Sequence, residues 1–214
     1  MILFDCDGTL TDSHGIIVSA MQQAFASCNF PAPSGPDVNG VIGLSLRRAV
    51  QALLGDAHQE DVLLLEQVMQ SYRQHYLALE HQVRLFPDVR ETLELLRARG
   101  YWLGVVTGKS HPGLVRVLET FELADFFLVL RTADCTHSKP HPAMVLESMQ
   151  ELGVNAHQTC VVGDTVLDAQ MAGSAGVRFF GVSYGVATDD ELRREGAQRV
   201  LNDFTELLAH FPPL

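Results

Sequence analysis

Residues 1–10 have the sequence MILFDCDGTL, in which four apolar residues lead into two aspartates, Asp5 and Asp7. The apolar run predicts a short buried strand that ends at the acids. Because strand side chains alternate between faces, Asp5 and Asp7 are expected on one side, with Cys6 facing away. Gly8 is expected to let the backbone turn sharply. Two carboxylates about 4 Å apart repel by about 4 kcal/mol at an effective dielectric of 20, and a bound divalent cation would reverse that cost.

Composition limits the classes of partner. The chain has 214 residues, of which 47% are hydrophobic, enough for one core domain with a small inserted one. The net charge of −11 disfavours nucleic acids and anionic membranes as partners, and no apolar run approaches the ~18 residues of a membrane span. The four cysteines are scattered without metal-type spacing, so we expect reduced thiols in a cytoplasmic protein.

The order of the expected elements predicts an α/β fold. Residues 14–82 show only helical signals, over 17–28, 38–54 and 60–81, with a loop at 30–36. After a helix that follows residues 86–88, strands over 101–106, 126–130, 159–162 and 178–182 alternate with helices. Such alternation predicts an open parallel sheet with helices on both faces. We therefore expect a core domain of residues 1–13 and 83–214, with an all-helical cap domain, residues 14–82, inserted after the first strand.

Polar residues follow the predicted strands at the positions where open parallel sheets bind ligands. Thr107 and Gly108 follow one strand and offer a hydroxyl and exposed backbone N–H groups to an anion. Lys139 precedes a helix, and it and Lys109 are the only lysines among fifteen basic residues, which favours a function for the ammonium group. Asp164 ends another strand, and Asp168 lies one helical turn beyond it.

Four motifs resemble, in order, the signatures of the haloacid dehalogenase-like (HAD) hydrolases. They are DCDGT at 5–9, TGK at 107–109, SKP at 138–140 and GDTVLD at 163–168. The resemblance covers nearly the whole chain and is greatest to the phosphoglycolate phosphatase-like branch, which has a Rossmann-like core and a small helical cap. It implies a magnesium-dependent phosphatase that acts on a small phosphorylated metabolite, such as phosphoglycolate or a sugar phosphate.

The resemblance also implies a role for each matching residue. Asp5 would be the nucleophile that forms an aspartyl-phosphate, and Asp7 the general acid and base. Thr107, Gly108 and Lys139 would bind the phosphoryl group. The residues implied as ligands of Mg²⁺ are Asp5, the backbone carbonyl of Asp7, and Asp164; Asp168 would support the metal site, either as a direct ligand or by contacting the groups that bind the ion.

Single residues separate related chemistries of this superfamily. Asp7 argues against the ion-pumping ATPases, which carry threonine there, and against the dehalogenases, which lack this second aspartate. The absence of lysine from residues 14–82 excludes the Schiff-base route of the phosphonate hydrolases. A hexose-phosphate mutase would carry a cap histidine near the position of Ile17, although His14 lies nearby. A mutase and a catalytically degenerate binding or regulatory module both remain as alternatives.

The cap is expected to select the substrate, which should be a small-molecule phosphate ester. An arginine at a loop–helix junction, Arg47, could clamp a carboxylate or a second phosphate, although a solvated helix arginine is an equal alternative. The protein is expected to be a monomer or a homodimer. The residues expected to face the site from the cap and its junction are Asp12, Ser13, His14, Gly43, Ser45, Arg47 and Arg48.

Overall fold

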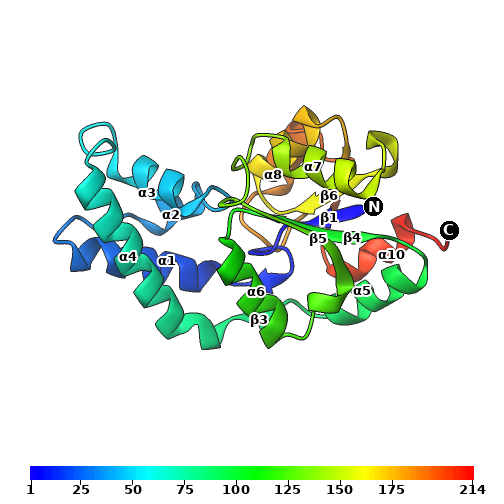
Figure 1. The fold of residues 1–214 in the computed structure, drawn as a ribbon, viewed down its shortest axis with the longest axis horizontal. Helices are drawn as coiled ribbons and strands as arrows, with labels where there is room; N and C mark the ends of the chain where they lie inside the picture. Colours follow the sequence, from blue (N-terminus) through cyan, green and yellow to red (C-terminus); the bar gives the residue numbers. More distant parts are fainter.

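The structure, a computed structural model, describes residues 1–214 and contains a six-stranded sheet (Figure 1). The strands lie in the order β5-β4-β1-β6-β7-β8, and every neighbouring pair is parallel. The predicted open parallel sheet is therefore confirmed. The strand bounds are β1 Ile2–Phe4, β4 Leu103–Thr107, β5 Phe127–Thr132, β6 Cys160–Gly163, β7 Arg178–Val182 and β8 Arg199–Leu201.

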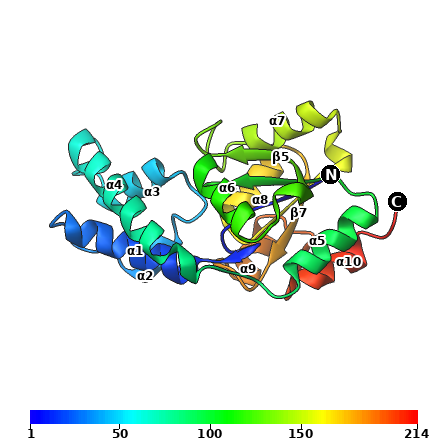
Figure 2. The ribbon, with the colours of Figure 1, turned by 60° about the horizontal axis from the view of Figure 1, so that its bottom comes forward.

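Helices cover both faces of this sheet, because its strands are apolar on both sides (Figure 2). In β1, Ile2 and Phe4 join one buried cluster and Leu3 joins the other. The first cluster includes residues of α5 (Val89–Ala98), α6 (His111–Thr120) and α10 (Leu207–His210). The second includes residues of α7 (Ala143–Leu152), α8 (Val166–Ser174) and α9 (Asp189–Arg194). Short 3₁₀ turns precede β5, β6 and α10, at Ala124–Phe126, Ala156–Gln158 and Phe204–Glu206.

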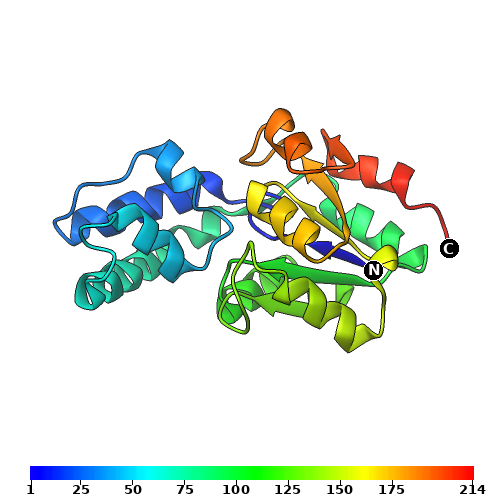
Figure 3. The same ribbon diagram turned by 90° about the horizontal axis from the view of Figure 1, so that it is seen from above.

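The helices of residues 14–82 lie together beside the sheet, at its strand ends (Figures 1 and 3). They pack around a third cluster of 13 buried residues, which is distinct from the two clusters of the sheet. The chain enters and leaves this segment through a short antiparallel pair, β2 (Thr11–Asp12) and β3 (Arg84–Leu85). The helices are α1 His14–Ser27, α2 Gly35–Asn39, α3 Leu46–Leu54 and α4 Val62–Leu79, followed by a 3₁₀ turn at Glu80–Gln82.

Two differences from the predicted elements have physical causes. The single helix predicted over 38–54 is wrong, because α2 ends at Asn39 and α3 begins only at Leu46. Gly43 has a φ of +98°, which no helix allows, and Ser45 then caps α3 by accepting from the Arg48 N–H. Helix α9 had no apolar periodicity to predict it and begins with a capping box at Thr188. None of the helices combines the length and apolarity needed to cross a membrane.

Candidate active site

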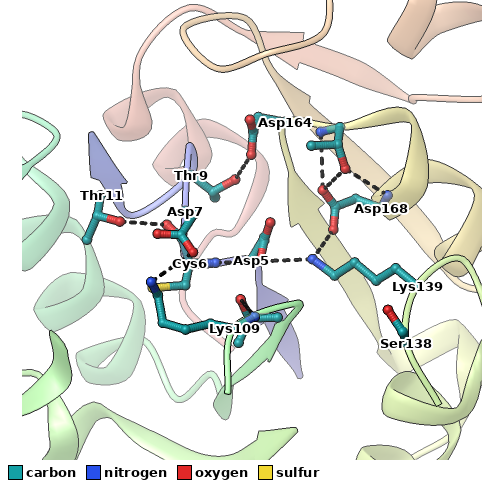
Figure 4. Close-up of polar contacts among 12 residues, drawn as sticks. Asp5, Cys6, Asp7, Thr9, Thr11, Lys109, Ser138, Lys139, Asp164 and Asp168 are labelled. Carbon is teal, nitrogen blue, oxygen red and sulfur yellow. Dashed lines mark hydrogen bonds and ion pairs between the residues drawn. The ribbon is translucent and has the colours of Figure 1, made fainter. Parts of the chain in front are cut away.

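The parallel order of the strands brings the motif residues to one edge of the sheet. Strand β1 lies between β4 and β6, and all three run in the same direction. Their carboxyl ends therefore place Asp5, Thr107 and Asp164 side by side, all of them buried. Figure 4 shows Asp5 at the centre, with Asp164, Asp168 and Lys139 on one side and Asp7 with Lys109 on the other.

Three buried carboxylates form an acidic cluster. One oxygen from each of Asp5, Asp164 and Asp168 lies within 4.8 Å of the others. Both oxygens of Asp164 also accept hydrogen bonds, from the Thr9 hydroxyl at 2.9 Å and from the Val186 N–H at 3.0 Å. These two donors fix the carboxylate; Thr9 belongs to the first motif, whereas Val186 lies outside all four.

The two carboxylate oxygens of Asp168 have different partners. Its Oδ2 accepts from the Thr165 hydroxyl at 2.6 Å and from the Thr165 N–H at 3.2 Å, which completes a capping box at the start of α8. Its Oδ1 lies 2.6 Å from Lys139 Nζ. The aspartate is therefore both the first-turn acid of a helix and a member of the acidic cluster.

Lys139 contributes an ammonium group to this cluster. It is fully buried, and its Nζ lies 2.8 Å from Asp5 Oδ1 as well as beside Asp168 (Figure 4). Burial alone lowers the pKa of Lys139, but the charges and hydrogen bonds of Asp168 and Asp5 hold it above its ordinary value. The lysine is thus a permanent cation.

The charge of the cluster fits a bound divalent cation. Burial raises the pKa of Asp5 to about 7; Lys139 opposes this rise, while the carboxylates of Asp168 and Asp164 add to it. Three carboxylates with one ammonium among them carry excess negative charge in a buried site. Carboxylate oxygens are the ligands that Mg²⁺ prefers, so the residues present fit that ion. Asp5, Asp164 and Asp168 would supply its side-chain ligands.

A pH dependence of stability follows from the raised pKa of Asp5. Between about pH 4 and pH 7 the folded, metal-free protein holds a proton that the unfolded chain has released. This carboxyl should therefore make the metal-free protein less stable as the pH rises through that range, by on the order of a few kcal/mol. Denaturant unfolding at pH 5 and pH 7 in EDTA would measure the loss. Asp5→Asn should flatten it, and an unchanged slope in that variant would contradict the assignment.

Asp7 lies outside the acidic cluster and points towards the helical segment. Its Oδ1 accepts from the Ser13 hydroxyl at 2.7 Å, and its Oδ2 lies 3.1 Å from Lys109 Nζ. Lys109 also donates, at 3.0 Å, to the hydroxyl of Tyr76, which belongs to α4. Burial lowers the pKa of Lys109, but the charge of Asp7, together with smaller contributions from neighbouring groups such as Tyr76, holds the pKa well above its usual range. One lysine therefore links the side chain of Asp7 to the helices.

A loop of the helical segment docks beside the expected phosphate-binding residues. A Cβ at Gly108 would lie 2.4 Å from the carbonyl oxygen of Gly43, so only glycine allows this approach. The Ser45 N–H donates to the Ser138 hydroxyl at 2.8 Å, next to Lys139. The loop thus contacts the residue that follows Thr107 and the residue that precedes Lys139.

His14 is drawn into the site by the turn that follows Asp7. Gly8 has a φ of +86°, as the expected sharp turn requires, and a Cβ there would lie 2.2 Å from Asp164 Oδ2. His14 Nε2 occupies the space beside it, 3.3 Å from the same oxygen. Burial lowers the pKa of His14, but the hydrogen bond and charge of Asp164 raise it above its ordinary value.

Of the remaining residues expected to face the site, three line the cavity above it and two do not. Gly43, Ser45 and Arg47 line a cavity that also includes Asp5 and Asp7, and Arg47 donates to Glu66 at 2.7 Å. Asp12 and Arg48 are exposed and do not line that cavity.

Comparison with known proteins defines the class of this α/β enzyme. A family model described as haloacid dehalogenase-like hydrolase matches residues 2–182. The chain belongs to this family of hydrolases, which confirms the resemblance seen in the four motifs.

Individual relatives match along almost the whole chain. The probable phosphatase IndB of Dickeya dadantii is 35% identical, over 97% of this chain and 91% of the relative. A phosphoglycolate phosphatase of Yersinia pseudotuberculosis is 31% identical, over 97% and 90%. The crystal structure of a predicted phosphoglycolate phosphatase from Haemophilus somnus superposes with a TM-score of 0.86 at 28% identity, over 99% of this chain and 97% of that one.

Proposed function

We propose that this hydrolase is a magnesium-dependent phosphatase that cleaves small phosphate monoesters through an aspartyl-phosphate at Asp5. The observation that carries the proposal is the acidic cluster of Asp5, Asp164 and Asp168 around one buried ammonium, with Asp7 beside it. The names of the relatives, which include phosphatase and phosphoglycolate phosphatase, support the same reaction class.

The nucleophile is the carboxylate of Asp5. Its oxygen attacks phosphorus and the bond to the leaving alcohol breaks, so the phosphoryl group passes to the enzyme. The Cys6 N–H donates to Asp5 Oδ1 at 2.7 Å and Lys139 holds the same oxygen, which orients the carboxylate and leaves Oδ2 for attack. Bound Mg²⁺ would favour the ionised form of Asp5 and offset charge on the phosphoryl oxygens.

Asp7 moves the proton in both halves of the reaction. In the first, its protonated carboxyl donates to the leaving alkoxide oxygen; in the second, its carboxylate accepts a proton from the water that attacks the aspartyl-phosphate. The hydrogen bond from Ser13 and the ion pair with Lys109 fix its orientation. Its side chain is free for this role because only its backbone carbonyl is proposed as a metal ligand.

The phosphoryl oxygens are held by groups at the end of β4 and by a lysine in the loop between β5 and α7. Thr107 supplies its buried hydroxyl, Gly108 its backbone N–H and Lys139 its ammonium. The loop at Gly43–Ser45 lies against these groups and would exclude bulk water from the phosphoryl group. We further propose that residues 14–82 act as a cap domain on a core of residues 1–13 and 83–214.

Removal of the metal tests this proposal. Phosphate release from a panel of small esters should fall to background in EDTA and return with Mg²⁺, since without the ion one ammonium alone offsets the charge of the three carboxylates and the phosphoryl group. Mg²⁺ should also raise the melting temperature, because it binds only the folded site. Asp164→Asn should lose this thermal stabilisation, whereas Asp12→Asn, at an exposed position, should keep it. Full activity in EDTA would contradict the metal dependence.

A further inference from the structure

The cavity above the reacting carboxylates is large for the phosphate ester of a two-carbon acid. It has a volume of about 640 Å³ and is lined by 27 residues, 13 of which are hydrophobic. Cavities of roughly 300–1,000 Å³ accommodate drug-sized ligands. The alcohol part of the substrate therefore has room for a ring.

The wall opposite the sheet is apolar and aromatic. Ile17 and Met21 of α1 and Met69 of α4 line it, and all three are buried within the cluster of the helical segment. Tyr72 and Tyr76 also line it, with ring centroids 5.8 Å apart. An apolar group that leaves water for this wall gains roughly 25 cal/mol for each Å² it buries, so a ring is favoured over a short polar chain.

Three of the four cations that line the cavity already have acidic partners. Lys109 Nζ lies 3.1 Å from Asp7, Arg47 donates to Glu66 at 2.7 Å, and Arg116 donates to Glu80 at 3.0 Å.

Arg73, the remaining cation of the lining, is exposed on α4, so its charge is solvated. A carboxylate on the substrate would have to displace one of the existing partners or bind to a guanidinium that water already surrounds. Away from the phosphoryl site, the cavity thus disfavours an anionic leaving group.

We propose that this enzyme prefers phosphate esters of uncharged, ring-bearing alcohols over esters whose alcohol carries a carboxylate. The proposal rests on the phosphatase function proposed above and concerns only the alcohol that the cavity accepts. It predicts a substrate unlike phosphoglycolate, after which several of the relatives are named.

Four esters separate the effect of size from that of charge. Ethyl phosphate and 2-phosphoglycolate have small alcohols, and benzyl phosphate and 4-carboxybenzyl phosphate have ring-bearing ones. In the second ester of each pair the alcohol part carries a carboxylate. With Mg²⁺, kcat/KM for benzyl phosphate should exceed that for each of the other three by at least about tenfold, a difference of 1.4 kcal/mol. A higher value for 2-phosphoglycolate than for benzyl phosphate would overturn the proposal. Failure to hydrolyse any of the four would instead overturn the phosphatase function, and this inference with it.

A matched pair of variants tests the charge argument. Glu66→Gln removes the partner of Arg47 at an exposed position and should raise the ratio of kcat/KM for carboxylated over uncharged esters several-fold. Glu60→Gln removes the same charge from an exposed residue that does not line the cavity, and it should leave the ratio unchanged. An unchanged ratio in both variants would refute the role assigned to the paired cations.

A second pair tests the apolar wall. Tyr72→Ala should lower the ratio of kcat/KM for benzyl over ethyl phosphate several-fold, because the wall loses an aromatic face. Leu63 lies on the same helix, but it is 78% exposed and does not line the cavity. Leu63→Ala should therefore leave the ratio at the wild-type value. Equal ratios in the two variants would contradict the placement of the ring against α4.

Discussion

Replacing Asp5 by asparagine is expected to abolish turnover, with kcat lower by at least about 10⁴-fold, in a protein that remains folded. The amide has the shape of the carboxylate but cannot form the acyl-phosphate bond. The fold should persist because Lys139 keeps Asp168 as its partner. At pH 7 the variant should even gain stability in EDTA, since burial and the neighbouring acids disfavour the charge at this position.

Two measurements distinguish this role from a structural one. Acid-quenched wild-type enzyme should carry one phosphate group on the peptide that contains Asp5, and the variant should carry none. Asp12→Asn makes the same chemical change at an exposed aspartate and should retain full activity. Turnover by Asp5→Asn above about one per cent of wild type would remove the nucleophile assignment.

Replacing Lys139 by methionine should damage both stability and activity. The substitution keeps the volume but removes the one ammonium among three buried carboxylates, which should cost about 3–5 kcal/mol of unfolding free energy in EDTA at pH 7. The loss should shrink at lower pH, where the carboxyls bind protons, and Mg²⁺ should restore part of the stability. Because the phosphoryl group loses a fixed positive partner, kcat/KM with Mg²⁺ should fall by about 10²–10³-fold.

The other lysine provides the comparison. Lys109→Met removes an ammonium from Asp7, whose side chain still has Ser13 as a donor and is 13% exposed, so its stability loss should be smaller. Chemical denaturation of both variants with and without Mg²⁺ would rank them. A Lys139→Met protein as stable as wild type in EDTA at neutral pH would show that the acidic cluster does not need this cation.

The sheet and its polar ends could be predicted because both are local patterns. Each buried strand is a short apolar run, and the motifs that contain Asp5, Thr107 and Asp164 lie at the ends of their strands, so the parallel sheet places Asp5 near Asp164. The donors that orient these acids could not be predicted in the same way. Thr9 belongs to the first motif, but its partner Asp164 lies 155 residues away in the sequence, and Val186 has no sequence context that marks it as a donor.

The helical segment was harder to predict in detail for a related reason. Its helices show periodicity, but their contacts with the core depend on single loop residues, such as Gly43 beside Gly108. Tyr76 has the spacing of a residue in the helical core and is indeed buried there, yet its hydroxyl also accepts from Lys109. Only the folded arrangement reveals this second contact.

The scarcity of lysine has a practical consequence. Lys109 and Lys139 are the only side-chain amines of the chain, and they are 9% and 0% exposed. An acylating reagent can therefore modify these lysines readily only in molecules in which the structure around them has opened. The α-amine of Met1, on the far side of the sheet from the helices, serves as an internal reference for reagent strength (Figure 1). Mass spectrometry of these three positions would then report how often the structure opens around each lysine, without any engineered label.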